Sequence, residues 1–208
     1  MKTVGGIGYI ISLIPVINLV SPLLVGLAWY QMGSRAQKTL FKATGVFMIA
    51  TFLATAAFLA IFSAIFLPIL TTAFAAGGMG FVDPSTLVPS ILGSLLAFVG
   101  FAVVLGVLGL VVFILELVSH FRAASLYGNK WFSRAGWLRV ISVILVFVVI
   151  GVVFATSGLA MTANAGPELL LSAMFLPMIP LAIMGLLAVI FSAVAFFTLQ
   201  EEAPPPPT

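Results

Sequence analysis

The sequence predicts an all-α fold, a polytopic bundle of about five transmembrane helices. Only 6% of its 208 residues are charged and 63% are hydrophobic, with a mean hydropathy of +1.34. Soluble domains carry about a quarter charged residues, so this chain lacks the polar surface of a water-soluble fold. Short connectors divide the apolar sequence into runs long enough to cross a membrane. We therefore expect one transmembrane helical domain over 1–200, located in the cell membrane.

The first expected span covers 5–30, and Trp29 near its end suits a membrane interface. Pro15 and Pro22 interrupt this span. Proline disturbs a helix interior because it lacks the backbone N–H donor. An alternative therefore makes 13–24 a re-entrant segment, which leaves four spans and both chain ends inside.

The second expected span covers 44–70 and carries small and large residues on opposite faces. Alanines recur every four residues, at Ala56, Ala60 and Ala64. Phenylalanines follow two positions later, at Phe58, Phe62 and Phe66. Two residues correspond to about 200° around a helix. Because small residues let membrane helices approach closely, we expect the alanines to pack on a neighbouring helix and the phenylalanines to meet lipid.

Three further spans are expected, over 91–118, 140–160 and 169–199. The first of these has four glycines that indicate another packing surface: Gly93, Gly100, Gly106 and Gly109. The last is interrupted by Pro177 and Pro180. The Pro-rich tail, 201–208, is expected to be exposed and extended.

The basic residues gather in two connectors. Three lie in 35–42 and four in 122–139, at Arg122, Lys130, Arg134 and Arg139. The positive-inside rule places both connectors in the cytoplasm, which for five spans puts the N-terminus outside and the C-terminus inside. In the second connector the bases alternate with aromatic residues, so we expect all four to contact lipid headgroups. Because the bases flank apolar spans, membrane lipids rather than nucleic acid are the expected partners.

Few residues of the expected spans can carry chemistry. Glu116 is the only ionisable residue near a span interior, and His120 follows one turn later. The simpler interpretation is an interfacial ion pair of Glu116 with His120 or Arg122. The functional alternative is a proton relay, since histidine titrates near neutral pH. Asn18, between the prolines of the first span, is a candidate for a polar site in a broken helix.

No enzyme, cofactor or metal site is expected. The chain has no cysteine, and one histidine with one glutamate does not complete a metal coordination shell. The leading interpretation is a non-catalytic structural or accessory subunit that packs against other membrane proteins or itself. The alternatives are a small transporter or channel that uses the Pro-broken spans with Glu116, and a lipid-interacting, membrane-organising protein.

Three segments resemble an archaeal integral-membrane family known as domain of unknown function 996. They are VGGIGYIISLIP at the start, FRAASLYGNKWFSRAGWL in the second basic connector, and LAVIFSAVAFFTL near the end. A related archaeal family is a close alternative. The resemblance implies an archaeal multi-pass membrane protein and supplies no activity or site residue.

Overall fold

The computed structural model describes residues 1–15, 17–75, 84–162, 166, 168, 171–172 and 175–200. Its regular elements are α1 (Lys2–Ile11), the 3-10 turn η1 (Ile17–Val20), α2 (Ser21–Arg35), α3 (Thr39–Ala75), α4 (Pro84–Tyr127), α5 (Lys130–Thr162) and α7 (Met178–Phe197). In this part of the chain, four helices are long and apolar enough to cross a membrane: α3, α4, α5 and α7. The all-α fold is confirmed, and the four apolar helices suggest a membrane protein; the five spans and their orientation stay predictions. The predicted tail 201–208 lies outside the described residues.

The segment expected as one span over 5–30 instead forms a hairpin of two short helices. Pro15 lies in the turn, and Pro22 lies in the first turn of α2, where its missing N–H needs no helical partner. At 1.5 Å per residue, α1 is about 15 Å long and α2 about 22 Å. Neither reaches across a hydrocarbon core of about 30 Å. A hairpin of two short helices fits the re-entrant alternative, whose four spans and inside chain ends stay a prediction.

The second basic connector is much shorter than predicted because α4 and α5 continue into it. Only Gly128 and Asn129 separate the two helices. Gly128 has φ of 62°, a left-handed conformation that glycine adopts without strain. Asn129 Oδ1 accepts a hydrogen bond of 3.0 Å from the Trp131 amide, which caps the start of α5. Most of 122–139 is therefore the end of one span and the start of the next.

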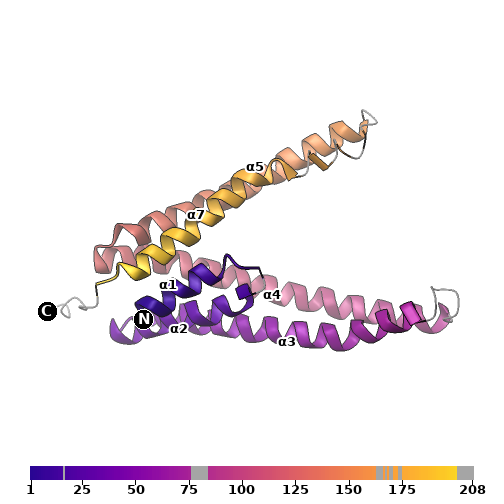
Figure 1. Cartoon of the computed structure of the whole chain (residues 1–208), viewed down its shortest axis with the longest axis horizontal. Helices are drawn as coiled ribbons and strands as arrows, with labels where there is room; N and C mark the ends of the chain where they lie inside the picture. The colour runs from indigo at the N-terminus through magenta and orange to yellow at the C-terminus, as the bar shows by residue number, and fades with distance from the viewer. Residues whose placement is uncertain are drawn as a thin grey trace.

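Two long helical hairpins, α3–α4 and α5–α7, form a V (Figure 1). They meet at one end, here called the closed end, and diverge toward the other, the open end. The α1–α2 hairpin lies at the closed end, where α1 packs on α7 and α2 on α3. Among the described residues the backbone of α4 also lies close to that of α5, whereas α4 meets α7 through side chains, with His120 Nε2 3.1 Å from Ser192 Oγ. The N-terminus and the end of α7 both lie at the closed end (Figure 1).

An aromatic cluster fills the closed end. Trp29 of α2, Phe41 of α3, Phe132 of α5 and Phe196 of α7 are all fully buried. The Trp29 ring centroid lies 5.2 Å from that of Phe196 and 5.5 Å from that of Phe41. Rings at such distances contribute both buried area and favourable edge contacts. This cluster joins both arms of the V to the α1–α2 hairpin.

Glycines allow α2 and α3 to cross closely at the same end. A Cβ added at Gly45 would lie 2.5 Å from the Gly26 carbonyl oxygen, so this crossing has no room for a side chain. Small residues thus do carry helix packing, at positions other than those predicted. On α4, a Cβ added at any of the four predicted packing glycines would meet nothing within 4 Å: Gly93, Gly100, Gly106 and Gly109.

The two faces of α3 are also reversed within the chain. Phe58 packs on Phe98 and Phe101 of α4, with ring centroids 5.3 Å apart in each pair, and Phe62 also contacts Phe98. The predicted packing residues are exposed: Ala56, Ala60 and Ala64. The prediction that the phenylalanines meet lipid is therefore wrong for Phe58, because interlocking rings gain more contact with α4 than alanines would. The side chain of Phe66 lies outside the described part.

Candidate functional site

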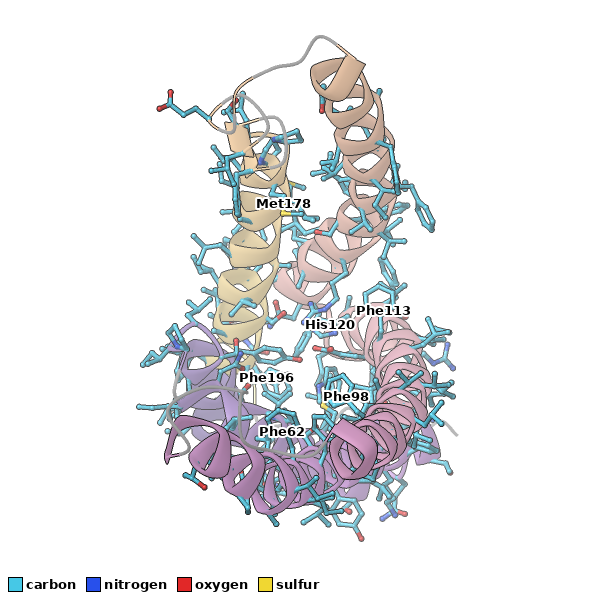
Figure 2. The ribbon with its side chains drawn as sticks, turned by 90° about the vertical axis from the view of Figure 1, so that its right-hand side faces the viewer. Phe62, Phe98, Phe113, His120, Met178 and Phe196 are labelled. Carbon is cyan, nitrogen blue, oxygen red and sulfur yellow. The ribbon has the colours of Figure 1, made fainter. Side chains whose placement is uncertain are left out.

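A cluster of polar side chains lies buried at the closed end, and we call it the polar clasp. Its members come from five helices: Tyr9 of α1, Trp29 of α2, Glu116 and His120 of α4, Arg139 of α5, and Ser192 of α7. Seen from the open end, His120 lies between the α5–α7 pair and the α3–α4 pair (Figure 2). The clasp therefore connects both arms of the V.

An ion pair forms the centre of the clasp. An Arg139 guanidinium nitrogen lies 2.5 Å from Glu116 Oε1, and the two side chains are 10% and 13% exposed. The Tyr9 hydroxyl donates to the same carboxylate oxygen at 2.5 Å. The Trp29 indole N–H in turn donates to the Tyr9 oxygen at 3.2 Å. Buried charges are tolerated when they are paired and hydrogen-bonded, and this arrangement provides both.

The opposite side of Arg139 faces Ser192 and His120. Its second terminal nitrogen donates to Ser192 Oγ at 2.8 Å and lies 3.3 Å from His120 Nε2. Arginine can only donate, so Nε2 is the acceptor. His120 Nδ1 lies 2.8 Å from the Glu116 carbonyl oxygen, which can only accept. His120 is therefore a neutral imidazole with its proton on Nδ1.

Aromatic rings enclose this histidine. The centroid of the fully buried His120 ring lies 5.2 Å from that of Trp29 and 5.7 Å from that of Phe132, both with edge contacts. Beside it, the hydroxyls of Thr44 and Ser119 are 2.7 Å apart and join α3 to α4. The side of the clasp around His120 is thus enclosed and hydrogen-bonded, as a buried polar cluster must be.

The ion pair differs from the one predicted. Glu116 pairs with Arg139 of the next span and not with His120 or Arg122. Glu116 lies 11 residues before the end of α4, and Arg139 lies 9 residues after the start of α5. Because the two helices are antiparallel neighbours with a two-residue connection, these positions come to the same depth. His120 instead bonds the backbone of Glu116.

Of the four basic residues predicted to contact lipid headgroups, three are exposed and one is buried. Arg122, Lys130 and Arg134 are exposed near the closed end, and the Arg134 guanidinium lies 4.7 Å from the centre of the Trp131 ring. Arg139 is 8% exposed and belongs to the clasp, so its expected headgroup contact is wrong. The short connection between α4 and α5 brings the Glu116 carboxylate beside Arg139, and this carboxylate stabilises the buried charge.

Asn18 does not join Glu116 and His120. It is exposed in η1 and lines a separate cavity of about 190 Å³, together with Pro15, Pro22 and residues of α3. A second cavity, of about 260 Å³, lies directly against Tyr9, Glu116 and Arg139. The structure thus places two small cavities along the α1–α2 hairpin, and only the second touches the clasp.

Tyr9, Trp29 and Ser192 are clasp members that the sequence did not identify. Tyrosine and serine occur often within the apolar runs of membrane helices, so their presence in the sequence did not by itself indicate a buried polar site. Arg139 gave a stronger one, because it is the connector base that directly precedes the apolar run 140–155. A charge entering a span calls for a partner of opposite sign, and Glu116 was the available acid.

Among the described residues, no group of three or more His, Asp or Glu side chains could hold a metal ion. The expectations of no metal, cofactor or enzymatic activity stay predictions.

No protein-family model matches this chain, and no curated protein or solved structure matches it either. The resemblance to the archaeal family therefore also stays a prediction.

Proposed function

We propose that this chain is a non-catalytic integral membrane protein, a structural or accessory subunit that packs against other membrane-embedded helices. The observation that carries the proposal is the contrast between the two ends of the V. At the closed end, glycines are pressed against neighbouring helices, as at Gly26 and Gly45. Toward the open end, glycines of the spans have no neighbour where a Cβ would lie, as at Gly106 of α4 and Gly158 of α5.

Small residues in lipid favour helix association. The alanine face of α3, centred on Ala60, is likewise exposed in the single chain. Beyond the contact of His120 with Ser192, α3 and α4 diverge from α7 toward the open end (Figure 1). Helices of another chain, or of a second copy, would pack on these surfaces.

We further propose that the closed end lies in the cytoplasm. Seven of the eight basic residues belong to helix ends or connectors there: Lys2, Arg35, Lys38, Lys42, Arg122, Lys130 and Arg134. The eighth, Arg139, is buried in the clasp. The positive-inside rule then places both the N-terminus and the end of α7 inside. The exposed bases, with Trp131 and Trp137 beside them, would contact anionic headgroups.

Native mass spectrometry of the protein, gently extracted from its own membrane, tests the accessory role. We expect a complex with another membrane protein or a homo-oligomer. Ala60→Leu should weaken that complex, because a larger side chain on the alanine face keeps a partner helix away. Ile61→Leu, at a neighbouring residue that is 50% exposed, is the matched control. A monomer alone, or a complex equally stable in both variants, would contradict the proposal.

A small transporter is the second candidate, favoured by the cavity that lies against the Glu116–Arg139 pair and the broken α1–α2 hairpin. Proton-driven flux in proteoliposomes tests it, with Glu116→Gln as the variant. We expect no specific flux in the wild type, because Arg139 and neutral His120 are held by hydrogen bonds within the clasp. Robust flux that Glu116→Gln abolishes would favour the transporter over the accessory role.

A further inference from the structure

The cavity beside the clasp faces the open end of the V. Tyr9, Glu116 and Arg139 form one wall of it. Val112 also lines it and lies one turn beyond Glu116 toward the open end, as does Val189 relative to the clasp residue Ser192. The clasp residues therefore form the wall of the cavity nearest the closed end, and Val112 and Val189 lie on its side toward the open end.

Besides the Tyr9 phenol, which donates to Glu116, three aliphatic hydroxyls line this cavity, and each has already used its single proton. Ser12 donates to the Tyr9 carbonyl oxygen at 2.6 Å. Ser21 donates to the Gly8 carbonyl oxygen at 2.8 Å, and Thr51 to that of Phe47 at 2.9 Å. A hydroxyl has one donor and two acceptor lone pairs. The oxygens of these residues consequently remain available only as acceptors.

The carboxylate of Glu116 adds to this excess of acceptors. Within the described structure, the hydrogen bonds of its side chain go to Oε1, from Tyr9 and Arg139. The second oxygen, Oε2, retains its acceptor capacity. The cavity thus suits a ligand that donates several hydrogen bonds.

Charge and size restrict that ligand further. Glu116 and Arg139 are the charged residues of the lining, and as a pair they are neutral overall. An ion would therefore gain no net charge attraction, whereas an uncharged donor can still hydrogen-bond to the acceptor oxygens of the lining. The volume of about 260 Å³ lies just below the roughly 300–1,000 Å³ of small-molecule sites. Apolar residues such as Val25 and Met48 complete the lining and suit a short carbon skeleton.

We propose that this cavity binds the neighbouring hydroxyls of an uncharged glycerol group. The group is either free glycerol or the headgroup of a monoacylglycerol whose acyl chain lies between the diverging arms. Its hydroxyls would donate to Ser12, Thr51 and Glu116, and its carbons would contact the apolar lining.

The test uses the full chain in phosphatidylcholine nanodiscs, with 1-monoolein, free glycerol and methyl oleate as separate probes. Native mass spectrometry and calorimetric titration measure retention and affinity. We expect monoolein to bind and methyl oleate, which has the same chain and no hydroxyl donor, not to bind. Competition by free glycerol would identify the polyol alone as sufficient, whereas its failure to compete would identify the lipid. Equal retention of monoolein and methyl oleate, or binding of neither monoolein nor glycerol, would overturn the proposal.

Two isosteric variants locate the site. Thr51→Val removes one acceptor and should weaken monoolein binding by about fivefold, the effect of one neutral hydrogen bond. Thr55→Val, one turn further along α3, alters the separate cavity at Asn18 and should leave the affinity unchanged. Within the described residues, each threonine hydroxyl bonds the preceding turn of its own helix, so both variants should fold. Equal affinities in the two variants would place the ligand elsewhere.

Discussion

Replacement of Glu116 by glutamine tests whether the clasp holds the two arms together. The variant keeps the shape of the side chain but leaves the Arg139 charge facing a neutral amide. Arg139 would lose its 2.5 Å ion pair and retain its 2.8 Å bond to Ser192. Tyr9, which donates to the same carboxylate oxygen, would lose a charged acceptor. We therefore expect the free energy of unfolding to fall.

The burial of the pair sets the size of this loss. Removing one partner of a buried ion pair costs about 3–5 kcal/mol. The amide oxygen can still accept one hydrogen bond, so we expect the lower limit, about 3 kcal/mol, or roughly a 150-fold change in the unfolding equilibrium. Glu168→Gln, at an exposed acid, is the matched control and should cost less than about 0.5 kcal/mol.

Unfolding by sodium dodecyl sulfate in mixed micelles provides the measurement. Trp131→Phe and Trp137→Phe leave Trp29 as the sole tryptophan of the chain. Its indole donates to Tyr9, so its fluorescence reports directly on the clasp. The double variant Glu116→Gln with Arg139→Met should lose less than the sum of the two single losses, by at least about 1 kcal/mol. Equal stability of Glu116→Gln and Glu168→Gln would refute the structural role of the clasp.

Three further substitutions are measured by the same unfolding assay. Gly45→Ala should lower the free energy of unfolding by about 1–3 kcal/mol, because the added methyl group overpacks against α2. Gly106→Ala, with open space around it, should be neutral or stabilising. Equal effects of the two substitutions would contradict the close crossing of α2 and α3. Phe58→Ala should lower the free energy of unfolding by about 1 kcal/mol or more, because it removes ring contacts with α4. Phe154→Ala, at a side chain 76% exposed, should lower it little. A larger loss for Phe154→Ala than for Phe58→Ala would favour the originally predicted faces of α3. Asn129→Ala should lower the free energy of unfolding by about 1–2 kcal/mol, because it removes the cap of α5 and the 3.1 Å hydrogen bond to the Ala195 carbonyl oxygen of α7. An unchanged midpoint of unfolding would show that the cap is dispensable.

Composition and hydropathy were sufficient to predict the all-α class, because apolar runs of twenty or more residues are typical of transmembrane helices, whereas barrel strands alternate apolar and polar residues over about ten. They were not sufficient to predict whether the segment 5–30 forms one span or a hairpin. The run 5–30 is long and apolar enough to cross, and Pro15 and Pro22 predict a break without deciding whether the chain then continues or turns back. That choice depends on tertiary contacts: α1 packs on α7, and α2 packs on α3.

The clasp shows a similar limit. The sequence identified Glu116 and His120, but the partner of Glu116 depends on the length of the connector between α4 and α5. A long headgroup segment would leave Arg139 at the surface, whereas a two-residue connection places it beside the acid. Likewise, the four-residue spacing of Ala60 and its neighbours correctly defines two faces of α3. Spacing alone does not determine which face meets α4.

We propose that α1 and α2 form a re-entrant hairpin, with both chain ends on the cytoplasmic side of four spans. Because the chain has no cysteine, single cysteines at Thr3, Gln37 and Glu168, all exposed, can be labelled without background. The measurement is labelling by a membrane-impermeant maleimide in right-side-out and inverted vesicles. We predict that Thr3→Cys and Gln37→Cys react only in inverted vesicles, and that Glu168→Cys reacts only in right-side-out vesicles. Reaction of Thr3→Cys on the same side as Glu168→Cys would show that 5–30 crosses the membrane and would contradict the re-entrant hairpin.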